Sequence, residues 1–372
     1  MKPVRRGRLV EIIGLFVGAL AVAWEPAAAQ HSAPIPGAPK ELRVGVVTFL
    51  SGQVSGTFGI PAKQAADVWI DKINEEGGIG GAKVAQVLID EEGSADKAVS
   101  EFRRLVLDEK VNLVIGYISS ANCLAVAPVA EELKVLTVLF DCGTTRVFEE
   151  ARYKYVFRTT AHTGIDGIAA ARYLLAAKPD VKTVAGLNED YAWGRDSWEI
   201  FSRALRKLKP EVQVVATLWL LRAGRAHALA APKLFQDEVS VEISKLLTAK
   251  PDVIFHSLWG PDLRSLNSQG RVRGLFQQSL VIHNNSAFQM KEFRNDLPDN
   301  VVVGFRGTNW PDVPDPARNR LQKEFVERCT KKYGDPCGRP TGAITWCRRC
   351  RASRRPTRRP QGARAVGRHR IR

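Results

Sequence analysis

Residues 43–49 read Arg-Val-Gly-Val-Val-Thr-Phe, a short run dominated by β-branched residues. A continuous run of this kind is typical of a strand that is buried on both faces of a parallel sheet. Residues 61–76 follow, and their apolar side chains recur at the spacing of an amphipathic helix. A second β-branched run at residues 84–89 completes a strand–helix–strand unit, which indicates a parallel pair of strands. This stretch therefore predicts an α/β fold.

The same alternation continues along the chain. Further segments are predicted as follows: helix 95–109, strand 111–116, helix 121–133, strand 135–140, helix 164–177, strand 183–187, helix 194–208, strand 212–218, helix 239–249, strand 252–257, helix 263–270 and strand 279–282. Because the cycle restarts after Phe157, we expect two Rossmann-like lobes with parallel sheets, joined by a hinge. Residues 42–158 plus 284–345 are assigned to the N-terminal lobe and residues 159–283 to the C-terminal lobe. Residues 220–231 fit neither a strand nor a helix and are interpreted as an insertion.

Ligands of open parallel sheets bind beyond the carboxyl ends of the strands. Five loops lie there by prediction: 50–57, 117–122, 141–145, 188–194 and 258–262. The loops of the first lobe carry hydroxyl and amide groups, which suit a carboxylate or amide ligand. The loops of the second lobe carry Asp190, Asp262 and aromatic side chains, which suit an ammonium group. The alternative is that these residues only form turns and helix caps.

The net charge of +16 belongs mainly to the two ends of the chain. Residues 346–372 contain eleven arginines and no acid, and residues 30–345 carry only +3. Residues 1–29 combine a basic start, an apolar stretch and an Ala27-Ala28-Ala29 site, which predicts a cleavable signal peptide and export to the periplasm. The apolar stretch is shorter than the roughly 20 residues of a bilayer-spanning helix, although an uncleaved anchor remains the alternative. We expect a mature protein that does not span the membrane.

Residues 346–372 are expected to be a disordered tail, because an arginine-rich segment of this kind cannot bury enough apolar surface to offset the entropy of ordering. One interpretation is a basic arm for nucleic acid or membrane. The other, which we favour, is out-of-frame translation of a GC-rich gene, so that the C-terminus is truncated or frame-shifted. Trp346 is the only aromatic residue from position 341 onward, whereas single-strand binders interleave aromatic and basic residues. No specific nucleic-acid binding is expected.

An enzyme is not expected. The six histidines are scattered, and the chain has no G-x-S-x-G, H-E-x-x-H or P-loop motif. Cys142 is conceivable as a nucleophile, but oxidation is the more natural fate of a thiol in an exported protein. The sequence therefore predicts no catalytic residue, no metal site and no cofactor.

Several segments resemble a known family. These are Asn-Glu-Glu-Gly-Gly-Ile-Gly-Gly at 74–81, Ile-Gly-Tyr-Ile-Ser-Ser at 115–120, Phe-Arg at 157–158, Asp-Tyr-Ala-Trp-Gly at 190–194 and Pro-Asp-Val-Ile-Phe at 251–255. In order and spacing they are similar to the type I periplasmic substrate-binding proteins of ABC transporters, in the leucine-binding-protein-like group that takes branched-chain amino acids and amides. The similarity covers about residues 42–345.

The resemblance implies a monomeric periplasmic carrier whose two lobes close on a small polar ligand and deliver it to an ABC transporter permease. A ligand-sensing module of the same fold and a non-functional frame-shifted product remain alternatives. In the family the chain would continue beyond Trp346 with a helix of the first lobe and strands of the second. Because the arginine tail stands there instead, we expect a sheet edge and an apolar face to be left uncovered.

The resemblance also implies a set of ligand-binding residues. Ser119, Ser120 and Thr144 would hold a carboxylate or amide, Tyr191 and Trp193 would pack against the ligand, and Asp262 would meet its amine. The complete expected set is Ser119, Ser120, Asn122, Thr144, Asp190, Tyr191, Trp193 and Asp262. Trp193 stands where many relatives have Tyr, and Asp262 is shorter than the Glu of amino-acid binders. A branched-chain amino acid and an amide or urea-like ligand therefore both stay open.

Two cysteine pairs are candidates for disulfide bonds. Cys123 and Cys142 follow neighbouring predicted strands and should lie at one edge of the sheet. Export favours a disulfide between them, and two buried free thiols are the alternative. Cys329 and Cys337 are candidates for a second bridge.

Overall fold

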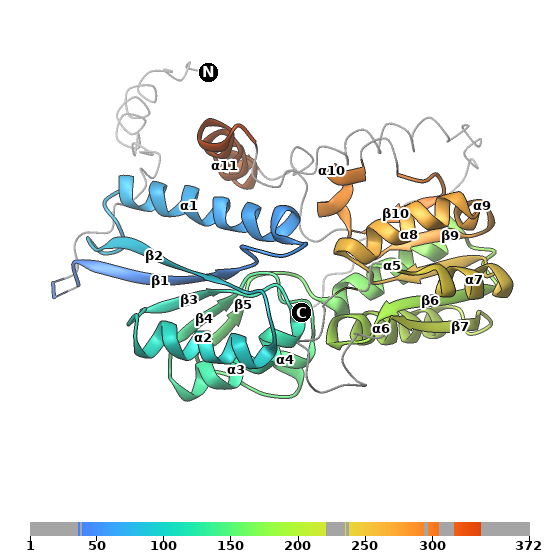
Figure 1. Ribbon diagram of the computed structural model, residues 1–372, viewed down its shortest axis with the longest axis horizontal. Coiled ribbons are helices and arrows are strands. Elements are labelled where there is room, and N and C mark those ends of the chain that lie inside the picture. The colour runs from blue at the N-terminus through green and yellow to red at the C-terminus, as the bar shows by residue number, and fades with distance from the viewer. Residues whose placement is uncertain are drawn as a thin grey trace, which may run out of the picture.

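The computed structural model describes residues 36–37, 39–220, 235, 238–293, 297–304 and 316–335. Its described part forms two α/β lobes side by side (Figure 1). Each lobe is built on a five-stranded sheet, ordered β2-β1-β3-β4-β5 in the first and β10-β9-β8-β6-β7 in the second. All strand pairs in both sheets are parallel. The prediction of two lobes with parallel sheets is confirmed.

The first lobe contains β1 (Glu41–Thr48), the single turn η1 (Ser55–Gly59), α1 (Ile60–Glu75), β2 (Lys83–Asp90), α2 (Ala95–Leu107), β3 (Leu113–Gly116), α3 (Ser120–Glu132), β4 (Leu136–Leu139), α4 (Arg146–Glu149) and β5 (Val156–Arg158). Helices α1 and α11 (Pro316–Tyr333) lie on one side of the sheet, and α2 and α3 lie on the other (Figure 1). Strand β1 is apolar on both faces for this reason. Val44 and Val46 pack under α1, whereas Val47 faces the core beneath α2 and α3.

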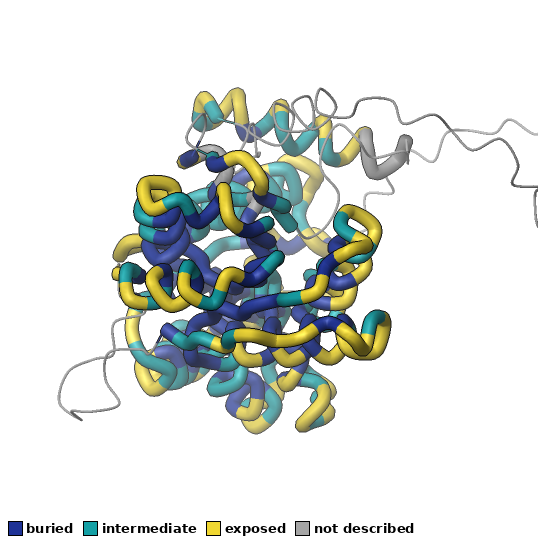
Figure 2. Tube along the Cα trace, turned by 90° about the vertical axis from the view of Figure 1, so that its right-hand side faces the viewer, coloured by how far each residue is buried: buried dark blue, intermediate teal, exposed yellow. Residues whose placement is uncertain are grey.

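The second lobe contains α5 (Thr163–Ala177), β6 (Thr183–Glu189), α6 (Ala192–Leu208), β7 (Gln213–Leu220), α7 (Ser240–Ala249), β8 (Val253–His256), α8 (Gly260–Val272), α9 (Leu275–Gln278), β9 (Leu280–His283), η2 (Ala287–Gln289), α10 (Met290–Phe293) and β10 (Val301–Val303). One core lies between the sheet and α5 and α6, and the other between the sheet and α7, α8 and α9. Figure 2, in which the second lobe faces the viewer, shows buried segments running through the middle, with exposed turns at the outside.

The predicted lobe boundary at residue 283 is wrong. Strand β10 pairs in parallel with β9, with Val301 opposite Val281 and Val303 opposite His283. Residues 284–293 and 297–304 therefore belong to the second lobe. The chain is back on the first lobe at α11, where Trp69 of α1 stacks on Phe325 at a centroid distance of 5.7 Å.

Charged side chains reinforce this packing of α11 on α1. Lys72 pairs with Glu324 at 2.8 Å, and Arg328 pairs with Glu75 at 2.9 Å. Such partly exposed pairs contribute little each, about 0–1 kcal/mol, so the stacked rings and the buried Val68 and Cys329 give the contact its main stability.

Within the part of the chain that the structure describes, one face of the strands β4 and β5 is incompletely covered. The residues of β3, β4 and β5 alternate between fully buried side chains, which face α2 and α3, and side chains that face the opposite side. On β3 the latter, Leu113 and Ile115, pack with Val44 and Val46 under α1. On β4 and β5 they form what we name the uncovered strip: Leu136, Val138 and Phe157. Leu136 is 41% exposed and Phe157 is 51% exposed. Parallel strands that are apolar on both faces are normally covered on both faces, so the strip is unusual.

The predicted signal peptide (1–29), most of the predicted insertion and the arginine tail (346–372) lie outside the described residues. Among the helices that are described, none combines the length and apolarity needed to cross a bilayer.

Candidate ligand-binding site

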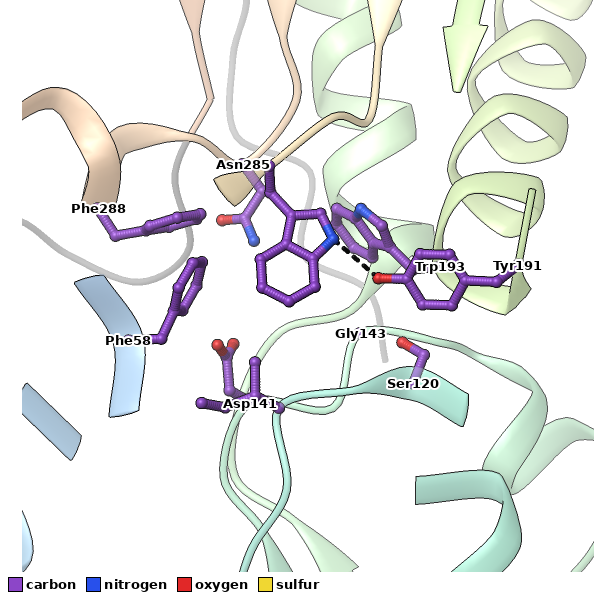
Figure 3. A pocket seen from close by; sticks show the side chains of 10 residues that line it. Phe58, Ser120, Asp141, Gly143, Tyr191, Trp193, Asn285 and Phe288 are labelled. Atoms are coloured by element: carbon purple, nitrogen blue, oxygen red, sulfur yellow. Dashed lines mark hydrogen bonds between the residues drawn. The ribbon is translucent and has the colours of Figure 1, made fainter. Parts of the chain in front are cut away.

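A pocket lies between the two lobes, at the carboxyl ends of their strands. It has about 330 Å³ of empty space, in part continuous with solvent. Its lining residues come from both lobes: Phe58, Ile118, Ser120, Asp141, Gly143, Tyr191, Trp193, Trp259, Asn285 and Phe288 (Figure 3). This is the position at which open parallel sheets bind ligands.

Three of the eight expected site residues line this pocket, namely Ser120, Tyr191 and Trp193. Their direct contact with a ligand stays a prediction. The other five do not line it, and the contacts of the described residues show what they do instead.

Ser119 and Asn122 serve a buried carboxyl group. Glu91 follows β2, is 3% exposed, and accepts hydrogen bonds from the backbone N–H of Ile118 at 2.9 Å and of Ser119 at 2.8 Å. It also accepts one from the side-chain amide of Asn122 at 3.2 Å. Burial raises the pKa of Glu91 to about 8, and these three donors oppose the rise. Glu91 thus fixes the loop between β3 and α3 from behind.

Thr144 connects loops and lobes. Its backbone N–H donates to the Ser120 hydroxyl at 3.2 Å, and its own hydroxyl donates to Asp196 on α6 of the second lobe. Its carbonyl accepts from the Arg158 guanidinium at 2.5 Å. Burial raises the pKa of Asp196, and the Thr144 hydroxyl partly offsets that rise. The closed arrangement of the lobes is therefore joined by a buried polar link.

Trp259 joins polar and aromatic partners from both lobes. Its indole N–H donates to Glu189 Oε2 and to the Tyr191 hydroxyl, both at 2.9 Å, and the second of these bonds is dashed in Figure 3. Its ring meets Phe58 of the first lobe edge to face, at a centroid distance of 5.0 Å, and Phe235 at 4.8 Å. Buried Trp side chains need such a partner for the N–H, and here that partner also sets the ring orientation.

The two expected acidic residues of the second lobe are turned elsewhere. Asp190 forms an ion pair with Arg195. Asp262 lies in the first turn of α8 and is 1% exposed. Asp141, from the first lobe, is the Asp or Glu side chain among the lining residues. Asp262 does not line the pocket, and its contact with a ligand amine stays a prediction.

Some of the other lining residues lie in the loops predicted from the sequence, and some do not. Ile118, Asp141, Gly143 and Trp259 fall inside the five loops predicted at the strand ends, but they are not among the eight expected ligand-binding residues. Phe58 lies one residue beyond the loop 50–57. Asn285 and Phe288 follow β9, and the loop after this strand was not among the five. Applying the strand-end rule to the last predicted strand is the signal that would have found them.

The expected Cys123–Cys142 disulfide is wrong. Both residues are free thiols with no exposed surface, and they lie close enough that Cys142 contributes to the raised pKa of Cys123. Burial raises the pKa of Cys123 well above its ordinary value. The alternative, two buried free thiols, describes the structure. Cys329 is buried and disulfide-bonded, and its expected partner Cys337 lies outside the described residues.

Two histidines lie in the core of the second lobe, at the ends of β8 and β9. The rings of His256 and His283 are fully buried, with centroids 4.6 Å apart. His256 Nδ1 accepts the Leu258 N–H at 3.1 Å, so the ring is neutral with its proton on Nε2. Burial lowers the pKa of both rings, and that of His283 falls to about 3. Within the described part of the chain, no three metal-ligating side chains come together.

Comparison with known proteins identifies the family. Residues 41–344 match the family model of the periplasmic binding protein. The chain is 22% identical over 307 residues to the Leu/Ile/Val-binding protein of Citrobacter freundii, covering 82% of this chain and 76% of that protein. It is 29% identical over 167 residues to Leu/Ile/Val-binding protein homolog 3 of Brucella melitensis, covering 45% and 44%.

Solved structures share the fold. The solute-binding protein of an ABC transporter from Rhodopseudomonas palustris BisB5, in complex with 3,4-dihydroxybenzoic acid, has a TM-score of 0.64 at 23% identity, covering 83% of this chain and 79% of that one. The branched-chain amino acid transporter substrate-binding protein LivJ of Streptococcus pneumoniae, in complex with isoleucine, has a TM-score of 0.66 at 17% identity, covering 82% of each chain. Two lobes, parallel sheets and a pocket between them thus agree with the match over most of the sequence: the chain belongs to the periplasmic binding protein family, in its type I, leucine-binding-protein-like branch.

Proposed function

We propose that this protein is an exported, monomeric solute-binding protein of the periplasm, which captures one small ligand between its lobes and delivers it to an ABC importer. One observation carries the proposal: the pocket wall is shared between the lobes, so that the site is complete only when they meet. The buried Thr144–Asp196 hydrogen bond supports it, because this link joins a ligand loop of one lobe to a helix of the other.

The lining bears on the kind of ligand. Five of the ten lining residues are aromatic, a composition that favours a ligand with an apolar or flat body over a small, fully polar one. Among the structural relatives, one is in complex with isoleucine and another with 3,4-dihydroxybenzoic acid. A branched-chain amino acid, an amide and an aromatic compound are all ligands that the proposed function admits.

The first test measures lobe closure. The purified chain is screened by thermal shift against amino acids, amides, aromatic acids and amines, and every hit is followed by small-angle X-ray scattering. A ligand that binds the native state raises the unfolding midpoint, and closure lowers the radius of gyration. A set of hits without any change in scattering, or no hit from a broad solute library, would contradict the proposal.

The second test separates a carrier from a ligand sensor of the same fold. The ligand-loaded protein is added to proteoliposomes that contain a candidate ABC permease from the same organism, and uptake of radiolabelled ligand is measured. Uptake that depends on the protein supports a carrier. Tight binding without any uptake supports the sensor.

A further inference from the structure

Three buried polar side chains lie in a row at the carboxyl ends of β6, β8 and β9. We name them the polar row: Asn188, Ser257 and Asn284. They lie side by side across the sheet, because the Ser257 N–H donates to the Leu187 carbonyl at 3.4 Å. In the same way, the Asn284 N–H donates to the His256 carbonyl at 3.1 Å. Asn188 and Ser257 have no exposed surface, and Asn284 is 3% exposed.

The polar row faces helices α5 and α6. Its members come two residues after Gly186, Phe255 and Ile282, and a strand returns to the same face at every second residue. Phe255 and Ile282 belong to the core beneath α5 and α6, and a Cβ on Gly186 would meet the Trp198 ring of α6. The side chains of the row therefore lie between the sheet and these two helices.

Helix α6 adds a hydroxyl group on this side. The helix runs back along β6, with Gly194 packed against the Glu189 carbonyl and, one turn later, Trp198 packed against Gly186. Ser197 lies between these two contacts, at the level of the polar row, and has no exposed surface.

Polar atoms of these four residues have no hydrogen-bond partner within the part of the chain that the structure describes. They are both amide atoms of Asn188, the hydroxyls of Ser197 and Ser257, and the amide nitrogen of Asn284. Turning the Asn188 amide over does not help, because it exchanges two atoms that both lack a partner. Buried polar groups of folded proteins are nearly all hydrogen-bonded, so five such atoms in one place indicate a site that binds polar molecules, water among them.

The polar row adjoins the ligand pocket. Trp193 lines the pocket, and its indole N–H donates to the Ser257 carbonyl at 2.9 Å. Asn285 also lines the pocket and is the residue directly after Asn284. Figure 3 shows the Trp193 and Asn285 side chains on the wall that the second lobe provides. One layer of lining residues thus borders both the pocket and the row.

We infer that the polar row is a hydrogen-bonding subsite of the pocket, which takes an uncharged carboxamide or hydroxyl group of the ligand in place of bound water. This inference rests on the proposed function and names the ligand class of the same pocket. The ligand group enters beside the Trp193 ring. A carboxamide or hydroxyl matches the site because Asn188 offers both a donor and an acceptor, as the ligand group does.

A charged ligand group is not matched by the polar row. Its three members and Ser197 carry no ionisable group, so an ion there would lose its hydration without gaining a counter-charge. The carboxyl groups that are next to them in the sequence bind elsewhere: Glu189 accepts from the Trp259 indole, and Asp196 accepts from the Thr144 hydroxyl.

The experiment compares matched pairs of solutes on the full chain. The pairs are asparagine and leucine, threonine and valine, and 4-hydroxybenzoate and 4-methylbenzoate. Within each pair the shape is nearly the same, and only one member carries the extra amide or hydroxyl group. We expect that in at least one pair the polar member binds at least tenfold more tightly in isothermal titration calorimetry, because a site built for hydrogen bonds rejects an analogue that cannot make them.

Three variants locate the effect. Asn188→Leu keeps the approximate shape but neither donates nor accepts, and should reduce the tenfold preference to less than threefold. Asn267→Leu is the matched control and should leave the preference unchanged. Asn267 is also 3% exposed with both amide atoms unpartnered among the described residues, but it lies on α8, which packs on the opposite face of the sheet. Ser257→Ala removes a single hydroxyl and should weaken binding of the polar member at least threefold, without changing that of the apolar member.

Crystal structures of the protein with and without the preferred solute give a direct view. We expect water molecules within hydrogen-bonding distance of Asn188 and Ser257 in the ligand-free protein, and the amide or hydroxyl group of the solute in their place in the complex. A dry row, or a polar group bound elsewhere in the pocket, overturns the inference.

The binding results decide it as well. The inference is wrong if no pair shows the preference, if Asn188→Leu keeps it, or if Asn267→Leu loses it equally. Failure of all six solutes to bind also overturns it. In each of these cases the proposed function stands if another solute closes the lobes in the scattering experiment, so the two failures are distinguishable.

Discussion

The hydroxyl of Thr144 in the first lobe donates a hydrogen bond to the Asp196 carboxylate in the second lobe, and both groups are buried. Opening of the lobes must break this bond and return both groups to water. It therefore contributes to the balance between open and closed forms rather than to the stability of either lobe.

Thr144→Val should weaken binding of any ligand that closes the lobes. The variant keeps the shape of the side chain but leaves Asp196 buried without this donor in the closed form. Hydrogen bonds to charged groups contribute about 1.5–3 kcal/mol, which corresponds to a loss of affinity of about 10- to 100-fold. Thr145→Val is the control, because the Thr145 hydroxyl donates to Glu149 within the first lobe, at 2.9 Å. Equal losses in the two variants, measured by calorimetry, would argue against an interlobe role.

Trp259→Phe should reduce stability because it removes the indole donor from Glu189. The new ring can still contact Phe58, but the buried carboxylate loses one charged hydrogen bond, at a cost of about 1–3 kcal/mol in the free energy of unfolding. Adding Glu189→Gln should recover part of this loss. The four proteins form a double-mutant cycle, measured by urea unfolding. Additive effects of the two substitutions would mean that the pair is not coupled.

Acid should destabilise the protein through His256 and His283. Burial lowers the pKa of both rings, that of His283 to about 3, whereas an unfolded His has a pKa of about 6.5. Between these values the unfolded chain binds more protons than the folded one, so stability falls as the pH is lowered from about 6.5 toward 3. Each ring contributes a slope of up to about 1.4 kcal/mol per pH unit.

His283→Gln tests this assignment, because Gln keeps polar atoms at the site but does not titrate there. The variant should show a shallower loss of unfolding free energy between pH 6.5 and pH 4. His162→Gln is the control, because His162 is half-buried, caps α5 and lies outside this core. An unchanged pH slope in His283→Gln would show that other groups dominate acid unfolding.

Cys123 and Cys142 should both react with iodoacetamide in the denatured, unreduced protein, and neither should react in the native protein within hours. The reason is that both thiols are free and completely buried, and that burial raises the pKa of Cys123. Peptide mapping by mass spectrometry measures this. A peptide linked through these two cysteines would contradict the structure.

The sequence predicted the two-lobe plan because parallel strands that are buried on both faces leave continuous apolar runs. It misplaced the lobe boundary because β10 is only three residues long, and a run such as Val301–Val303 does not show which sheet it joins. The pairing of β10 with β9 depends on how distant parts of the chain fold together, so it cannot be read from the local sequence.

Only part of the site was predicted, because the direction of a side chain in a loop also depends on the folded chain. The strand-end rule finds loops, which is why Ser120, Tyr191 and Trp193 emerged, but it does not say which side chains of a loop point outward. Asp262 was expected to meet a ligand amine from the resemblance, yet it lies in the first turn of α8 and is 1% exposed. Cys123 and Cys142 were correctly expected to be neighbours, but proximity alone does not determine whether two thiols are bonded.

The uncovered strip gives a prediction of its own. Leu136→Thr combined with Phe157→Thr removes the two most exposed apolar side chains of the strip and keeps residues that favour strands. We expect slower loss of monomer on storage and a midpoint of unfolding within a few degrees of the parent. Val241→Thr is the control, since Val241 is 57% exposed on α7, away from the strip. If Val241→Thr slowed the loss of monomer equally, the strip would not be the surface through which the molecules associate.

Because of the strip, resistance to unfolding and resistance to aggregation are separate properties of this molecule. Helix α11 and the closed lobes protect each molecule from unfolding, a process that is independent of how many copies surround it. The strip acts only when two molecules collide, so losses through it should grow with the square of the protein concentration and should proceed well below the melting temperature. A dilute and a concentrated preparation would then have the same melting temperature, but the dilute one would keep its monomer much longer. Protein concentration, rather than melting temperature, would set how long the protein stays usable.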